Sequence, residues 1–92
     1  MGYKFEWNPD KAEANDKKHG VSFEKGISVF GDPLSMNMSD RDHSEDERRY
    51  IVLGVSDRHR VLVVCYAEIE ERTRLISARR ATRSERNSYE EE

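Results

Sequence analysis

The sequence predicts an α+β fold: a largely antiparallel sheet of four to five strands, two N-terminal helices and a short C-terminal helix, in the order β-α-α-β-β-β-α. Two patterns predict it. Apolar residues alternate with polar ones, or run together, in short segments typical of strands. Start and stop signals of helices flank the segments that lack this pattern. Hairpin-length turns join the last three strands, and a chain of 92 residues is expected to form a single domain, residues 1–92.

The N-terminal region is expected to begin with a strand and a helix. Residues 3–7 alternate aromatic and charged side chains, as a strand with one buried face does. Asn8 can cap a helix that begins at Pro9 and ends near His19, where Gly20 can adopt the left-handed conformation that closes it. The inner stripe of this helix is thin and carries a small residue, an amide and an imidazole: Ala12, Asn15 and His19.

A second helix is expected after Ser22, which can cap it. Its apolar stripe, expected to face the core, consists of Phe23, Ile27 and Phe30. Residues 31–33, Gly-Asp-Pro, end the helix. A short strand is then expected over residues 34–38, with Leu34 on its apolar side, and residues 39–47 are expected to form an exposed acidic loop.

Three strands and a helix are expected in the C-terminal half. The strands are residues 50–55, 61–68 and 73–80, joined by turns at 56–60 and 69–72. Residues 61–67 are apolar on both faces, which places their strand in the middle of the sheet with cover on each side. Thr82 and Glu85 have the spacing of a capping box and predict the start of the C-terminal helix.

Composition excludes several classes of protein. The single cysteine, Cys65, excludes an intrachain disulfide and a multi-cysteine zinc site. No apolar run approaches the roughly 20 residues that cross a bilayer, and the N-terminus lacks a signal-peptide pattern. Asp40, Asp42 and His43 could suggest a metal site, but acids clustered in a polar loop are usually solvated. We therefore expect a soluble, cytoplasmic protein with no membrane partner, no metal and no cofactor.

Charge is distributed unevenly along the chain. The net charge is −3, from 16 basic and 19 acidic residues. Residues 40–47 hold five acidic residues and one arginine, whereas residues 72–86 hold six arginines and one glutamate. A planar guanidinium can donate two parallel hydrogen bonds to a phosphate, so the second segment is suited to bind an anion. The alternative is that these arginines form a solvated strand edge and helix face.

Known catalytic motifs, such as a P-loop, His-Glu-x-x-His or a nucleophile elbow, are absent. The groups that remain are cations and imidazoles at the ends of expected helices, strands and turns: Lys18, His19, Arg60, Arg79 and Arg80. RNA can be cleaved without a metal, because its 2′-hydroxyl is a built-in nucleophile. Arginine and lysine can neutralise the charge that grows on the phosphorane, while histidine, glutamate, lysine or tyrosine transfers the protons.

Each of these residues also has a structural interpretation. Arg79 and Arg80 are successive strand residues, so only one is expected to reach a given site. His19, in the last turn of a helix, can simply pack there or interact with the helix dipole. Lys18 can be a solvated helix residue, and Tyr89 can be an anchor in the core.

Three segments carry a resemblance to a known family. They are residues 5–9 (FEWNP) with Lys11, Ala12 and Asn15, continued by residues 18–24 (KHGVSFE); residues 47–51 (ERRYI); and residues 74–82 (RLISARRAT) with Glu85, Arg86 and Tyr89. Together they resemble the BrnT family of toxins over nearly the whole chain, from Phe5 to about Tyr89.

The resemblance implies a RelE-like fold and a toxin of a bacterial type II toxin–antitoxin pair, acting as a metal-independent endoribonuclease that inhibits translation. It implies two partners: RNA, free or ribosome-associated, and a cognate DNA-binding antitoxin. The antitoxin would neutralise the toxin, and the complex would repress its own operon, so that operator DNA is reached only through the antitoxin. By family role, the catalytic candidates are Lys18, His19, Arg79 and Arg80, and the RNA-binding candidates are Arg49, Arg60 and Tyr89.

Two other functions stay open at this point. A non-catalytic interaction module would use the arginines to bind an acidic antitoxin segment and would act in operon autoregulation; the acidic net charge and the lack of one assured general base favour it. Direct DNA binding by this chain alone is disfavoured, because no helix rich in base-reading side chains is visible. RNA digestion with end-group analysis separates the enzyme from the other two.

Overall fold

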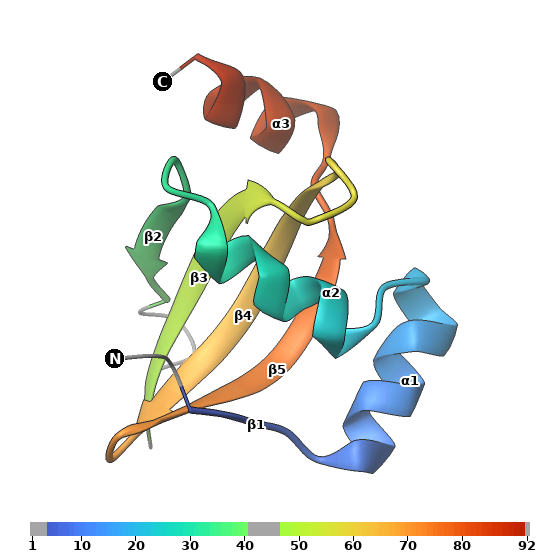
Figure 1. Ribbon diagram of the computed structural model, residues 1–92, viewed down its shortest axis with the longest axis vertical. Coiled ribbons are helices and arrows are strands. Elements are labelled where there is room, and N and C mark those ends of the chain that lie inside the picture. The colour runs from blue at the N-terminus through green and yellow to red at the C-terminus, as the bar shows by residue number, and fades with distance from the viewer. Residues whose placement is uncertain (1–3, 41–46, 92) are drawn as a thin grey trace.

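The computed structural model describes residues 4–40 and 47–91. They form a five-stranded sheet with two helices packed on one face and a third helix across one end (Figure 1). The elements are β1 (Phe5–Glu6), α1 (Pro9–His19), α2 (Phe23–Ser28), a 3-10 turn η1 (Val29–Gly31), β2 (Met36–Ser39), β3 (Arg48–Val55), β4 (Val61–Ile69), β5 (Arg72–Arg80) and α3 (Arg83–Glu90). The predicted α+β fold is confirmed.

The sheet has the strand order β1-β5-β4-β3-β2. Neighbouring strands are antiparallel except β1, which runs parallel to β5. β4 is the central strand, as its apolar residues on both faces predict. β1 is shorter than the strand expected over residues 3–7, and Tyr3 lies outside the described residues.

The core lies between the sheet and the helices α1 and α2. Val52, Val64 and Ala78 stand in register on three neighbouring strands and are fully buried. Phe23 of α2 is also fully buried, and its ring meets that of Trp7 edge-on, with centroids 6.0 Å apart. This packing is the main stabilising contribution to the fold, because burial of an aromatic or aliphatic side chain is worth about 1.5–3 kcal/mol.

The helix α1 has the predicted caps. The side-chain oxygen of Asn8 accepts hydrogen bonds from the backbone N–H groups of Asp10 (2.8 Å) and Lys11 (3.3 Å). Gly20 has a φ of 68°, in the left-handed region, and donates its N–H to the carbonyl of Asp16. These local signals therefore fix both ends of the helix.

A buried amide joins α1 to the sheet. The Asn15 side chain donates to the carbonyls of Val21 (2.9 Å) and Ala78 (2.8 Å) and accepts from the N–H of Ala78 (3.1 Å). β1 pairs only with the start of β5, at Thr73 and Arg74, and leaves the edge of β5 open further along. Asn15 therefore satisfies the strand edge at Ala78 as a neighbouring strand would.

The strand β2 begins later than residues 34–38 predict. Leu34 is 68% exposed and lies before the strand, which starts at Met36. The reason is the turn that precedes it: the Asp32 carboxylate accepts from the N–H of Leu34 (3.0 Å), and the Asp32 carbonyl accepts from Ser35 (3.1 Å). An aspartate that hydrogen-bonds to the backbone two residues on extends such a turn. The expectation for Leu34 was wrong for this reason.

The acidic loop expected over residues 39–47 is described only at its two ends. Ser39 belongs to β2, and the N–H of Asp40 donates to the carbonyl of Arg49. Residues 41–46 lie outside the described residues, and so do Asp42 and His43 of the metal-site alternative.

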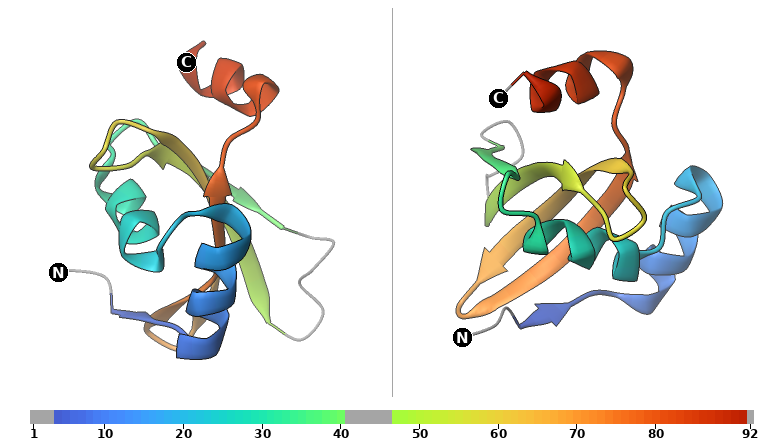
Figure 2. Two further views of the ribbon diagram at one scale, coloured as in Figure 1. Left: turned by 90° about the vertical axis from the view of Figure 1, so that its right-hand side faces the viewer. Right: turned by 45° about the horizontal axis from the view of Figure 1, so that its top comes forward.

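The two ends of the sheet differ in what surrounds them. At one end β3 and β5 finish, β4 begins, and α3 lies across them; we call it the α3 end (Figure 2). At the other, which we call the β1 end, β1 pairs with the start of β5 and β3 begins. α3 starts with the predicted capping box, in which Thr82 and Glu85 each accept from the other's backbone N–H.

Candidate nucleic-acid interface

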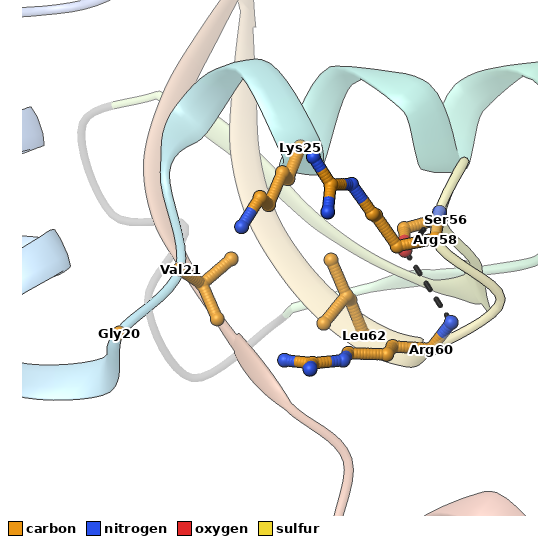
Figure 3. Close-up of a pocket in the computed structure, with 7 residues that line it drawn as sticks. All are labelled: Gly20, Val21, Lys25, Ser56, Arg58, Arg60 and Leu62. Carbon is orange, nitrogen blue, oxygen red and sulfur yellow. Dashed lines mark hydrogen bonds between the residues drawn. The ribbon is translucent and has the colours of Figure 1, made fainter.

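A small pocket lies at the α3 end, on the helix-covered face of the sheet. It holds about 40 Å³ and is lined by Gly20, Val21, Lys25, Ser56, Arg58, Arg60 and Leu62 (Figure 3). Val21 and Leu62 are each 2% exposed and form its apolar floor. Lys25 and Arg60 reach towards the hollow from different elements, α2 and the β3–β4 turn. The pocket therefore combines a buried apolar floor with cationic walls.

One buried serine shapes the turn that carries the two arginines. The hydroxyl of Ser56, which is 5% exposed, accepts from the N–H groups of Arg58 (3.2 Å) and Arg60 (3.4 Å). Its backbone N–H donates to the carbonyl of Arg60 at 2.8 Å, and its carbonyl accepts from the N–H of His59 at 2.9 Å. His59 takes up a φ of 61°, which allows the tight reversal. The turn thus presents Arg58 and Arg60 from a hydrogen-bonded frame.

A second serine ties this turn to α2, the helix that carries Lys25. The Ser28 hydroxyl donates to the carbonyl of Lys25 (2.5 Å) and accepts from the N–H of Asp57 (3.0 Å). The helix and the turn are therefore held together on two sides of the pocket. This brings Lys25 and the arginines of the turn, more than thirty residues apart in the sequence, to one hollow.

Among the residues that the structure describes, the cations of the pocket have no carboxylate partner. Neither Lys25 nor Arg58 nor Arg60 forms an ion pair with a residue that the structure describes. Arg80 is also unpaired among these residues, and it stands opposite Leu62 of the pocket floor in the β4–β5 register. Unpaired cations beside a concave surface attract an anion, because no internal charge cancels their field.

Arg79 has a different environment from Arg80. It follows Ala78, which faces the core, so alternation along β5 puts Arg79 on the opposite face of the sheet. Its guanidinium donates to both carboxylate oxygens of Glu85 in α3, at 2.8 and 2.9 Å. This hydrogen-bonded contact lowers the pKa of Glu85 from its ordinary 4.5 to about 2 and raises that of Arg79. The structure therefore separates the two arginines, as successive strand positions predict.

Tyr89 of α3 also makes a structural contact. Its hydroxyl donates to the carboxylate of Asp32 at 2.5 Å, and the same carboxylate oxygen accepts from the N–H of Val55. The hydrogen bond to Asp32 is the main cause that raises the pKa of Tyr89 to about 12. Burial works to raise the pKa of Asp32, but its hydrogen bonds from Tyr89, Val55 and Leu34 outweigh it and lower the pKa. Tyr89 thus stays protonated at neutral pH and ties α3 to the turn that precedes β2.

Arg49 lies at the β1 end, away from the pocket that contains Arg60. It lines a wider, open hollow of about 470 Å³ together with Trp7, Lys11 and Arg74. The arginines there meet carboxylates. The ion pairs are Arg49 with Glu47 (3.3 Å), and Arg72 (3.4 Å) and Arg74 (3.1 Å) with Glu6. The exception at this end is Arg48, which has no ion-pair partner among the described residues.

Lys18 and His19 lie in the last turn of α1, next to the pocket in sequence. Neither of them lines it; the residue that does is Gly20, directly after His19. Lys18 is exposed and His19 is half-buried. The structure thus brings Arg60 to the pocket. Arg80 stands opposite the floor residue Leu62, Lys18 and His19 precede the lining residue Gly20 in the chain, and Arg79, Tyr89 and Arg49 lie elsewhere.

Two pocket residues were not among the residues selected from the sequence, Lys25 and Arg58. The sequence did contain an indication for Arg58, because the expected turn of only five residues holds three basic side chains: Arg58, His59 and Arg60. For Lys25 the sequence contained no such indication, since a single lysine in an amphipathic helix is usually solvated. Its role follows only from the packing of α2 against the β3–β4 turn.

Within residues 4–40 and 47–91, no three His, Cys, Asp or Glu side chains cluster as metal ligands would. Of the helices described, none is both long and apolar enough to span a bilayer.

Comparison with known proteins first gives the class of protein, a toxin of type II toxin–antitoxin systems. Residues 7–85 match a family model described as "Ribonuclease toxin, BrnT, of type II toxin-antitoxin system". Because this match spans most of the chain, the protein belongs to the BrnT family of ribonuclease toxins. The family resemblance carried by the sequence motifs is confirmed.

A solved structure supports the fold. The chain is similar to the BrnT ribonuclease toxin of Brucella abortus, known from a crystal structure, with a TM-score of 0.63 and 19% sequence identity. The similarity covers 89% of this chain and all of the other. At this identity it shows a shared fold. A search of curated protein sequences finds no match.

Proposed function

We propose that this ribonuclease toxin cleaves RNA at the cationic pocket of the α3 end, without a metal ion, and inhibits translation by doing so. The observation that supports it most directly is the gathering of unpaired cations around one hollow: Lys25, Arg58 and Arg60 in its wall and Arg80 beside it. At the β1 end, by contrast, carboxylates already occupy Arg49, Arg72 and Arg74.

The proposed reaction uses the RNA's own nucleophile. The 2′-oxygen loses its proton and bonds to the adjacent phosphorus, the bond from phosphorus to the 5′-oxygen breaks, and the 5′-oxygen takes up a proton. The products are a 2′,3′-cyclic phosphate and a 5′-hydroxyl, and no water or metal is consumed. The transition state carries extra negative charge on the phosphorane, which guanidinium and ammonium groups held in place beforehand stabilise.

The positions of the candidates suggest a division of roles. Arg60 and Arg80 would hold the scissile phosphate, joined by Lys25 and Arg58. His19 or Lys18, beside the pocket at the end of α1, would transfer a proton. Arg79 and Tyr89 would act indirectly by fixing α3, and Arg49 would contact RNA only away from the site of cleavage.

Membership of a type II toxin family implies a cognate antitoxin. We propose that this antitoxin binds DNA, covers the cationic pocket with an acidic segment, and represses the operon together with the toxin. The toxin would then reach operator DNA only through the antitoxin, and would act on RNA, free or on ribosomes, in the cytoplasm.

The test is digestion of a defined RNA in the presence of EDTA, followed by end-group analysis. We expect cyclic phosphate and 5′-hydroxyl ends, and no cleavage of a substrate with a single 2′-deoxyribose at the cleaved position. Arg60→Gln should lower the rate by roughly 100-fold. The matched control is Arg72→Gln, which removes the same charge from an exposed position at the β1 end and should change the rate little.

Intact RNA, both with the free protein and on added ribosomes, would contradict the proposal. If such a protein still bound an acidic antitoxin segment through Arg60, the pocket would serve docking alone.

A further inference from the structure

The helix α3 is tied to the rest of the chain by hydrogen bonds and an ion pair, and it contributes no residue to the buried core. None of its residues is buried, and a helix of two turns is not stable in water by itself. Glu85 and Tyr89, one turn apart, share a face and make the contacts that fix it, with Arg79 on β5 and Asp32 before β2. The chain therefore maintains the position of a helix that adds nothing to its apolar core.

Two arginines of α3 take no part in these contacts. Arg83 and Arg86 are exposed, and neither forms an ion pair with any residue in the described part of the chain. Glu85, between them in the sequence, is already bound to Arg79. Both arginines belong to the first half of the helix, whereas Glu90 and Glu91 close its other end.

The start of α3 lies next to the cationic pocket. The N–H of Ala81 donates to the carbonyl of Val61 at 3.0 Å, and Val61 directly follows Arg60. Arg83 comes two residues after Ala81, at the first position of the helix. Figure 1 shows the beginning of α3 above the β3–β4 turn. Unpaired arginines therefore continue from the pocket, through Arg80, onto the first turns of α3.

We infer that the first half of α3 is a second RNA subsite, in which Arg83 and Arg86 bind backbone phosphates of single-stranded RNA next to the scissile one. The inference rests on the proposed function, because it assumes that RNA occupies the pocket. Guanidinium groups suit this role, since they bind phosphate through a planar pair of donors. The polar contacts of Glu85 and Tyr89 then have a purpose: they hold the subsite at a fixed distance from the pocket.

The test measures binding separately from cleavage. The probe is a single-stranded RNA of about ten nucleotides, 2′-O-methylated throughout so that it cannot be cleaved, titrated at several salt concentrations. The test variant is Arg83→Gln/Arg86→Gln. The control is Arg48→Gln/Arg72→Gln, which removes two exposed charges from the β1 end, with urea midpoints to confirm folding of both. Each phosphate of single-stranded RNA that the protein neutralises contributes about 0.7 to the slope with which the logarithm of the binding constant falls against the logarithm of the salt concentration.

We expect the test variant to bind more weakly and to lose about 1.4 from this slope, while the control keeps the slope of the unchanged protein. Cleavage of a dinucleotide, which is too short to reach α3, should be the same in both variants. Equal slopes in test and control variants, or no binding by the unchanged protein, would overturn the inference.

The two proposals can fail separately. Binding that depends on Arg83 and Arg86 without any cleavage supports the subsite and contradicts the ribonuclease mechanism. If cleavage depends on Arg60 but binding does not change when Arg83 and Arg86 are replaced, the ribonuclease mechanism is supported and the subsite is contradicted.

Discussion

At the scale of single residues, a few polar side chains decide how the pocket is positioned. Asn15 is the clearest case, because its amide connects α1, the segment after Gly20 and β5 through three hydrogen bonds. The sequence put Asn15 on the inner stripe of α1, but its partners Val21 and Ala78 could not be predicted. They depend on where β1 ends along the edge of β5, which is set by tertiary packing.

Asn15→Ala should lower the free energy of unfolding by about 2–4 kcal/mol, because it leaves buried backbone groups of Val21 and Ala78 without partners. Urea unfolding at pH 7 measures this. Asn87→Ala, at an exposed position of α3, is the control and should cost less than about 0.5 kcal/mol. Equal stability of the two variants would contradict the role of the buried amide.

The ion pair between Arg79 and Glu85 predicts a dependence of stability on pH. Its hydrogen bonds lower the pKa of Glu85 from 4.5 to about 2 in the folded chain. A depressed pKa means that the pair contributes its full stability above pH 4.5 and loses it as the pH falls towards 2. Glu85→Gln should therefore be less stable than the unchanged protein at pH 6, and the difference should shrink as the pH approaches 2. Urea unfolding across this range checks it, and a difference that stays constant would refute it.

At the scale of elements, the turns and caps were easier to predict than the packing between elements. Asn8 and Gly20 mark the ends of α1 by themselves, since a cap acts over only a few residues. The start of β2 was misplaced because Asp32 holds Leu34 in the preceding turn. The parallel pairing of β1 with β5 has no local signal at all, because it joins two segments from opposite parts of the chain.

The close packing of η1 and the residues after it against β3 explains the glycine near the end of that strand. A Cβ atom at Gly54 would lie 2.9 Å from Val29 Cγ1 and 3.0 Å from Ser35 Cβ, closer than packed atoms approach. Gly54→Ala should therefore destabilise the protein by about 1–3 kcal/mol, as overpacking does.

Gly31→Ala is the control for this substitution, because nothing lies within 4 Å of its added Cβ. Thermal unfolding compares the two variants. Gly→Ala by itself reduces the entropy of the unfolded chain and favours the folded state, so a loss for Gly31→Ala as large as that for Gly54→Ala would contradict the contact with Val29 as the cause.

At the scale of the whole molecule, folding divides most of the described arginines into two groups, with Arg48 and Arg79 as the exceptions. Arg49, Arg72 and Arg74 meet carboxylates at the β1 end, whereas Arg58, Arg60 and Arg80 are unpaired at the α3 end. A net charge of −3 is compatible with binding of an anion there, because none of the described carboxylates forms an ion pair with these three arginines.

The sequence showed that an arginine-rich segment exists and that Arg79 and Arg80 belong to opposite faces, but it could not show which arginines are paired with carboxylates. The division depends on which carboxylate each guanidinium meets. Glu6, the partner of Arg72 and Arg74, is distant in the sequence, and Glu85, the partner of Arg79, is near in the sequence but lies on a separate helix. For the same reason Lys25 could not be assigned to the site, because only the packing of α2 brings it to the pocket.

The central claim is that the unpaired arginines at the α3 end, and not the paired ones, act on RNA. The most direct measurement is kcat/KM for a defined RNA in EDTA, compared between Arg80→Gln and Arg74→Gln, two substitutions at opposite ends of the same strand. We predict that Arg80→Gln lowers kcat/KM by about 100-fold without a matching loss of thermal stability, while Arg74→Gln leaves it nearly unchanged. Equal effects of the two substitutions, or a larger effect of Arg74→Gln, would contradict the claim.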